Sequence, residues 1–196
     1  MANSKLIVVE GPQGAGKTTI TDFIRHSLAY TNLYRLSGTN DTTPAGKEKA
    51  HIMYIDLLDY MKKMENLSIN LLFDRTFFTE ENYCRLGKKE YTFTDIYDDL
   101  LDKFSKLDFD IYYITLYLKD VDQYNKRLNR EGKAQNKYAP FKVESSIKQQ
   151  ETYMKMAEEL KENTKNIKVV NFNTNRPLEE EYKELDELLE IKEKKK

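Results

Sequence analysis

The sequence contains a single cysteine, Cys84, which excludes an internal disulfide and suits a reducing compartment. No apolar run approaches the roughly 20 residues that a membrane-spanning helix needs, and the N-terminal residues lack a signal-peptide pattern. Neither sign of charge is in excess, since 32 basic residues face 33 acidic ones. This balance gives no overall attraction to nucleic acid or to an anionic membrane. The two histidines, His26 and His51, have no spaced partners, which argues against a metal site or acid–base role for them. These absences predict a cytoplasmic protein that binds neither membrane nor nucleic acid.

The chain of 196 residues is long enough to bury a core of its own, and we expect residues 1–196 to form one domain. Short apolar runs alternate with longer segments of helical periodicity, which is typical of βαβ units and a parallel sheet. The expected strands are 5–10, 33–37, 68–73, 110–118 and 166–172, and the expected helices are 17–29, 46–65, 79–87, 94–106, 143–162 and 177–191. The pattern therefore predicts an α/β fold.

The helix expected at 46–65 carries large apolar and aromatic side chains at helical spacing. This stripe is predicted to face the core, because such residues at this spacing are more often core than ligand cage. Its members are Met53, Leu57, Tyr60, Met61 and Met64.

Residues 11–18 read Gly-Pro-Gln-Gly-Ala-Gly-Lys-Thr and directly follow the apolar run 6–9. They match the G-x-x-x-x-G-K-[ST] phosphate loop at the place where that motif belongs, between a strand and a helix. The glycines permit backbone angles that turn consecutive N–H groups around an anion, and the helix start adds its positive dipole end. Lys17 is expected to reach the β- and γ-phosphates and Thr18 to hold Mg²⁺. The sequence thus predicts a site for a nucleoside triphosphate, with ATP and Mg²⁺ as cofactors. The expected ligands are Gly11, Gln13, Gly14, Ala15, Gly16, Lys17, Thr18 and Thr19.

A second polar pair, Asp74 and Arg75, follows the apolar strand expected at 68–73. In a phosphate-loop fold the strand beside the first one ends close to the metal, so Asp74 is expected to point its carboxylate toward Mg²⁺. Arg75 is then placed to hold an acceptor phosphate in a charge-assisted contact. The alternative is a solvated ion pair at the end of a strand.

Two segments carry a resemblance to known kinases. Residues 9–19, Val-Glu-Gly-Pro-Gln-Gly-Ala-Gly-Lys-Thr-Thr, resemble the opening of thymidylate kinases, and residues 74–79, continuing to Tyr83, resemble their second motif. The second segment is also similar to that of deoxynucleoside kinases, with Asp74 in place of Glu. The resemblance implies a three-layer P-loop NTPase fold. Its five-stranded parallel sheet would have the order 2-3-1-4-5, with helices on both faces. It also implies substrate contacts by Thr79 and Tyr83, and a homodimer formed through helices beside the sheet.

A basic segment at about 121–142 is expected to form a lid. Its basic residues are Lys126, Arg127, Arg130, Lys133, Lys137 and Lys142. Positive side chains that close over a migrating phosphoryl group stabilise its charge. Similar kinases carry such a lid, and Gln13 occupies the loop position where some of them carry the catalytic arginine instead. Arg130 is therefore our first choice for a catalytic lid arginine and Arg127 the second. A solvated basic helix is the alternative.

The region after the second strand helps to choose the acceptor. Residues 34–40 contain no acid, and the first one is Asp41, whereas nucleoside kinases resemble one another in carrying a carboxylate base here. A phosphate acceptor is already ionised and needs no base, so the absence favours a nucleoside monophosphate. The region also lacks the REPGG segment of thymidylate kinases, which leaves the base undetermined. Arg35 either neutralises the acceptor phosphate or is an exposed strand-end arginine.

The favoured hypothesis is an ATP- and Mg²⁺-dependent transfer of the γ-phosphoryl group to a (deoxy)nucleoside monophosphate, with Lys17, Arg75 and the lid arginines in catalytic roles. A deoxynucleoside kinase that uses Asp41 as a displaced base stays open, as do a polynucleotide 5′-end kinase and a nucleotide-binding protein without activity. A switch GTPase is disfavoured, because residues 136–139 end in Ala139 instead of the Asp that reads guanine.

Overall fold

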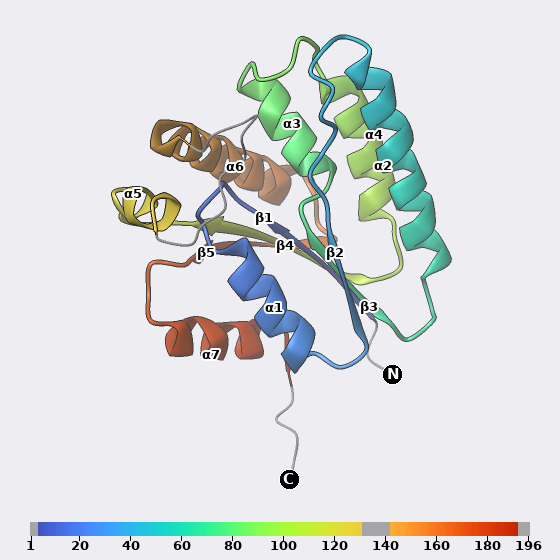
Figure 1. Ribbon diagram of the computed structural model, residues 1–196. Coiled ribbons are helices and arrows are strands. Elements are labelled where there is room, and N and C mark those ends of the chain that lie inside the picture. The colour runs from blue at the N-terminus through green and yellow to red at the C-terminus, as the bar shows by residue number, and fades with distance from the viewer. Residues whose placement is uncertain (1–3, 131–141, 192–196) are drawn as a thin grey trace.

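The computed structural model describes residues 4–130 and 142–191 and has a five-stranded parallel sheet at its centre (Figure 1). The strands are β1 (Lys5–Glu10), β2 (Thr31–Arg35), β3 (Asn70–Asp74), β4 (Asp110–Tyr117) and β5 (Ile167–Asn173). Their order is β2-β3-β1-β4-β5, and every pair is parallel. The predicted α/β class and the strand order implied by the resemblance are both confirmed.

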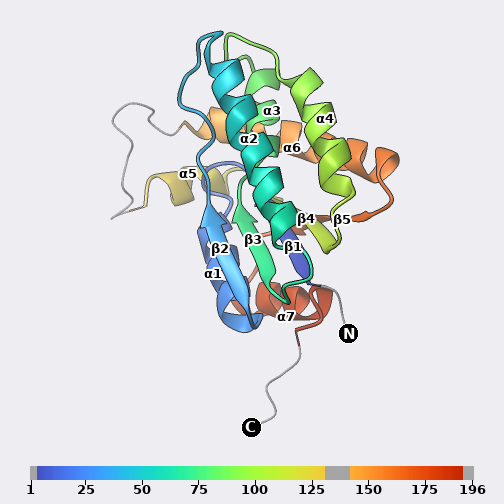
Figure 2. The same ribbon diagram turned by 90° about the vertical axis from the view of Figure 1, so that its right-hand side faces the viewer.

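Helices cover both faces of the sheet, which gives three layers (Figures 1 and 2). They are α1 (Lys17–Ser27), α2 (Gly46–Lys63), α3 (Phe77–Arg85), α4 (Thr94–Ser105), α5 (Gln123–Leu128), α6 (Val143–Asn163) and α7 (Leu178–Leu188). Side chains of α1, α5 and α7 join one apolar cluster, those of α2, α3 and α4 join the other, and α6 contributes to both. None of the helices in the described part of the chain is both long and apolar enough to cross a bilayer.

The central strand shows why a parallel sheet forms here. Leu6 and Val8 join the cluster under α2, α4 and α6, whereas Ile7 and Val9 join the cluster under α1 and α7. All four side chains are fully buried. A strand covered on both faces must be apolar at every position, and this is why the sequence shows a continuous apolar run here rather than an alternation.

The buried face of α2 differs from the predicted stripe. The buried residues of α2 are Gly46, Ala50, Tyr54, Leu58 and Met61. Of the predicted set, only Met61 is therefore fully buried. The other four predicted residues pack at the margin of the cluster and stay partly exposed. Ala50 and Tyr54 are fully buried, so the face of α2 that carries them is the one turned inward. The prediction was off by one residue.

The expected lid falls only partly within the described residues. The described part of it contains α5, which carries Arg127, and the chain is described again from Lys142. Lys133 and Lys137 lie outside the described residues, so the lid and the single-domain assignment remain predictions.

The strand ends prepare a site at one edge of the sheet. Val9 of β1 stands opposite Asp74 of β3, so the loop that follows β1 and the turn that follows β3 emerge side by side. The connection after β1 leads to β2 on one side of the sheet, whereas the connection after the neighbouring β3 leads to β4 on the other side. Ligands of open α/β sheets bind at such a reversal, beyond the carboxyl ends of the strands.

Gly11 is the first residue after β1 and should not tolerate a side chain. Its φ is +148°, and an added Cβ would lie 2.9 Å from the Leu116 carbonyl oxygen. Gly87 also has a positive φ, +67°, but no atom lies within 4 Å of an added Cβ, so it is a matched control. Gly11→Ala is expected to lower the free energy of unfolding by about 3 kcal/mol, and Gly87→Ala by about 1 kcal/mol. Urea unfolding measures both, and equal losses would show that the contact with β4 does not constrain Gly11.

Candidate active site

A cavity of about 520 Å³ lies beyond the carboxyl ends of β1 and β3. Six cationic side chains line it: Lys17, Arg35, Arg75, Arg127, Arg130 and Arg176. The carboxylates that line it are those of Asp74 and Glu181. The volume lies within the range of small-molecule sites, and the excess of positive charge favours an anionic ligand.

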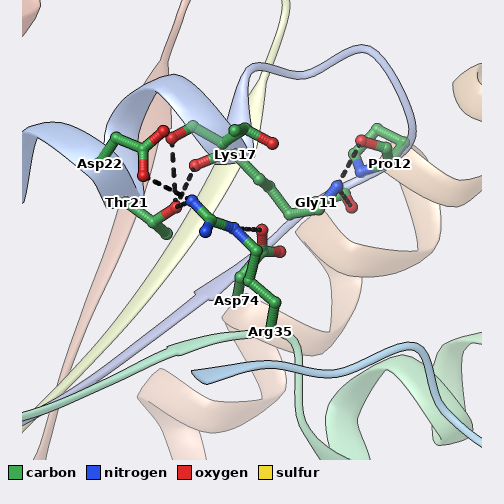
Figure 3. Close-up of polar contacts among 8 residues, drawn as sticks. Gly11, Pro12, Lys17, Thr21, Asp22, Arg35 and Asp74 are labelled. Atoms are coloured by element: carbon green, nitrogen blue, oxygen red, sulfur yellow. Dashed lines mark hydrogen bonds and ion pairs between the residues drawn. The ribbon is translucent and has the colours of Figure 1, made fainter. Parts of the chain in front are cut away.

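The phosphate loop wraps one end of this cavity. Gly14 and Gly16 have φ values of +85° and +96°, and Gly16 directly precedes α1. The ammonium of Lys17 donates hydrogen bonds of 2.7 and 2.8 Å to the carbonyl oxygens of Gly11 and Pro12 (Figure 3). The Lys17 side chain therefore lies along the loop, where an incoming phosphate would meet it.

Thr18 and Asp74 line the same cavity from α1 and from the end of β3. Mg²⁺ is commonly held by one or two protein oxygens together with phosphates and water, so this hydroxyl and carboxylate fit the ion. Within residues 4–130 and 142–191 no group of three or more His, Cys, Asp or Glu side chains forms a separate metal site.

Arg35 lies between Asp74 and α1. Its guanidinium donates a hydrogen bond of 2.6 Å to Asp22, and its Nε lies 3.7 Å from an Asp74 oxygen (Figure 3). Arg35 thus lies at the wall of the cavity, beside the carboxylate expected to face the metal.

Arg75 occupies a strained backbone position. Its φ is +74°, a value that costs a residue with a side chain roughly 1–2 kcal/mol. The turn is held by a hydrogen bond of 3.1 Å from the Arg75 N–H to the Val9 carbonyl. Its Nε is buried and has no hydrogen-bond partner among the described residues. Strain of this kind is concentrated at functional sites, where the surrounding structure supports it.

Glu10, which sequence reasoning missed, holds this turn in place. Its fully buried carboxylate accepts hydrogen bonds of 2.7 Å from the Thr76 N–H and 2.6 Å from the Thr79 hydroxyl. Burial raises the pKa of Glu10 to about 7, against the opposing effects of these hydrogen bonds and of the nearby Arg75 and Lys17 charges. The signal in the sequence was an acid at the end of an otherwise apolar strand.

Of the four residues predicted to contact substrate, Arg35 and Arg75 line the cavity, whereas Thr79 and Tyr83 lie along α3 and are not among the lining residues. Thr79 is fully buried, and its hydroxyl bonds both Glu10 and the Tyr153 hydroxyl, 2.9 Å away. Tyr83 is partly exposed, beneath the ammonium of Lys88. Their substrate roles remain predictions.

The two candidate lid arginines differ in their surroundings. Arg127 donates hydrogen bonds to the carbonyl oxygens of Gly14 and Thr174, and so ties the phosphate loop to the end of β5. Arg130 is exposed, lines the cavity and has no hydrogen bond or ion pair with another described residue. The Thr174 hydroxyl also donates a hydrogen bond of 2.6 Å to the Ala15 carbonyl. Sequence reasoning missed this link, and it also missed Arg176, which lines the cavity.

No protein-family model and no curated protein sequence matches the chain. Solved structures match nearly the whole of it. A thymidylate kinase from Candida albicans superposes with a TM-score of 0.66 at 18% identity, covering 97% of this chain and 92% of its own. The fold is that of the thymidylate and deoxynucleoside kinases.

Two further solved structures are similar to this chain. YorR of Bacillus subtilis, in complex with phosphorylated GDP, has a TM-score of 0.64 at 20% identity over 95% of this chain and 96% of its own. Deoxyadenosine kinase from M. mycoides with bound dATP has a TM-score of 0.59 at 17% identity over 94% and 99%. These likenesses establish the fold and leave the substrate of this chain open.

Replacement of Glu10 by Gln tests the buried carboxyl. Between pH 4.5 and about 7 the unfolded chain releases this proton while the folded protein keeps it, so wild-type stability falls as pH rises. The loss totals about 3 kcal/mol, at 1.36 kcal/mol for each pKa unit. Gln cannot ionise and does not lose this contribution. The unfolding free energy of Glu10→Gln minus that of the wild type should therefore increase by this amount from pH 4.5 to 8 in urea titrations. A constant difference over that range would contradict the raised pKa.

Proposed function

We propose that this protein is a phosphotransferase that moves the γ-phosphoryl group of ATP to a (deoxy)nucleoside monophosphate, with Mg²⁺ as its metal. The observation that carries the proposal is the single cavity that the phosphate loop, Asp74 and Arg75 share. A pure nucleotide binder has no need of a second cationic wall facing its phosphate loop. The kinase fold of the solved neighbours agrees with this assignment.

In this mechanism the protein mainly binds and orients the two phosphate groups. The backbone N–H groups of the phosphate loop and the Lys17 ammonium hold the donor, and Arg75 holds the acceptor opposite it. Thr18 and Asp74 would hold Mg²⁺, which neutralises charge on the phosphates when it is bound. Arg130 is the lid residue placed to stabilise the negative charge of the migrating group.

The choice of acceptor rests on Asp41, which is poorly suited to act as a general base. Asp41, the candidate base of a nucleoside kinase, does not line the cavity. Hydrogen bonds from Lys49 and Thr43 lower the pKa of Asp41 to about 2, and a carboxylate of that pKa is a poor proton acceptor. A monophosphate needs no base, so it suits this site better than a free nucleoside. The homodimer and the cytoplasmic location remain predictions from the sequence, which does not specify the nucleobase.

Turnover of a substrate panel tests the proposal. Wild-type protein with MgATP should phosphorylate at least one of the four deoxynucleoside monophosphates, or a modified pyrimidine monophosphate, and none of the matching nucleosides. Lys17→Met should lower kcat by about 100- to 1000-fold, because one donor to the transferred group is lost. Coupled ATP-consumption assays and product chromatography give the rates. Efficient turnover of a nucleoside alone would replace the proposal with a deoxynucleoside kinase.

Arg75→Ala separates the acceptor side from the donor side. We expect the KM of the monophosphate to rise at least about tenfold, since one charge-assisted contact is lost, with the KM of ATP changed less than about threefold. Arg25→Ala, an exposed arginine on α1, is the control and should change neither. A rise confined to the KM of ATP would move Arg75 to the donor side.

A further inference from the structure

Lys88 is a cation that the site described so far does not use. It follows α3 in the chain, and its ammonium lies 5.0 Å from the centre of the Tyr83 ring. The same ammonium donates a hydrogen bond of 2.7 Å to the hydroxyl of Ser145, in the first turn of α6. None of the ion pairs in the described part of the chain gives Lys88 a carboxylate partner.

The neighbouring charge is a second cation, Arg75. Desolvation lowers the pKa of Lys88, and the positive charge of Arg75 lowers it further. The negative charges of Asp74 and Glu10 stabilise the charged form of Arg75. Neither is among the charges that act on Lys88. Lys88 is exposed and Arg75 is partly exposed, and an anion bound between these two like charges would be attracted by both.

Arg75 also offers an unused donor. Its Nε is buried and has no partner among the described residues, although the side chain lines the cavity. A buried donor without a partner costs about 1–3 kcal/mol. A ligand with acceptor oxygens would satisfy it, which is an observation independent of the charge on Lys88.

The start of α6 brings this pair next to the phosphate loop. Ser146 donates a hydrogen bond of 2.9 Å to the Gln13 carbonyl, so the first turn of α6 bridges the loop and Lys88. Lys142, which precedes this 21-residue helix, provides no side-chain cap. The unpaired N–H groups and the positive dipole end of α6 therefore add to the same positive region.

We propose that Lys88 and Arg75, together with the first turn of α6, bind the phosphate group of the acceptor. This inference rests on the proposed function and deepens it by adding a second cation to the acceptor-phosphate contact, one that has no role toward a free nucleoside hydroxyl. Lys88 is then a specificity-determining residue that works beside Arg75. Tyr83 supports its ammonium from below through a cation–π contact.

Isothermal titration calorimetry without catalysis tests this assignment. Wild type, Lys88→Gln, Lys88→Arg and Lys155→Gln are each titrated with the four deoxynucleoside monophosphates, the four deoxynucleosides and MgATP. Lys155 is an exposed lysine on α6 and is the matched control for loss of one charge. Thermal unfolding of each variant shows whether it folds.

The expected result is a loss of affinity of at least about tenfold for the best monophosphate in Lys88→Gln, the size of one charge-assisted hydrogen bond. Lys88→Arg should keep the affinity within about threefold, and Lys155→Gln should match the wild type. MgATP and nucleoside affinities should not change in any variant. The charge-keeping variant separates binding of the anion from a merely structural contact with α6.

Three results would overturn the inference. One is an unchanged monophosphate affinity in Lys88→Gln, and another is a loss for MgATP as large as that for the monophosphate, which would place Lys88 on the donor side. The third is an equal loss for nucleoside and monophosphate, which would assign Lys88 to the sugar or the base. In all three the proposed function still stands if wild type phosphorylates a monophosphate. If wild type neither binds nor phosphorylates any monophosphate, the proposed function fails together with the inference.

Discussion

The buried carboxylate of Glu10 joins the two halves of the site. It ends β1, immediately before the phosphate loop, and accepts hydrogen bonds from the Thr76 N–H and the Thr79 hydroxyl at the start of α3. The segment between these partners and β3 contains Arg75, in its strained conformation. Burying a carboxylate opposes ionisation, and the nearby positive charges offset this only in part. The phosphate loop and the Arg75 turn are therefore joined through one buried, hydrogen-bonded side chain, and the geometry of the proposed site depends on it.

The positive charge of the cavity is local. The whole chain has a net charge of −1, yet six cationic side chains line one hollow with two carboxylates. The structure stabilises several of them with main-chain oxygens: Lys17 bonds the carbonyls of Gly11 and Pro12, and Arg127 bonds those of Gly14 and Thr174. Carbonyl dipoles stabilise these cations and leave their charge in place, so the cavity favours an anionic ligand.

The sequence was informative wherever the chemistry depends on neighbours along the chain. The phosphate loop is a continuous motif between a strand and a helix, so its place in the fold was predictable from eight residues. The strand order came from the resemblance, because periodicity alone does not order strands. The contacts that were missed join distant segments: Glu10 meets Thr76 across 66 positions, and Thr174 meets Ala15 across 159. The buried face of α2 was misplaced because its neighbours in the fold, rather than its own hydrophobic periodicity, decide which side turns inward.

The contacts of Arg35 show how the site keeps a charged residue beside Asp74 without occupying that carboxylate. The bond to Asp22, at 2.6 Å, is a direct charge-assisted hydrogen bond, whereas 3.7 Å to Asp74 is too long for one. Asp22 therefore anchors the guanidinium to α1. The interaction between Arg35 and Asp74 is a longer-range ion pair without a hydrogen bond. The side chain of Asp74 makes no hydrogen bond to another described residue, so its oxygens stay available to the cavity. A direct Arg35–Asp74 bond would instead have to be broken before any cation approached, and the observed geometry removes that competition.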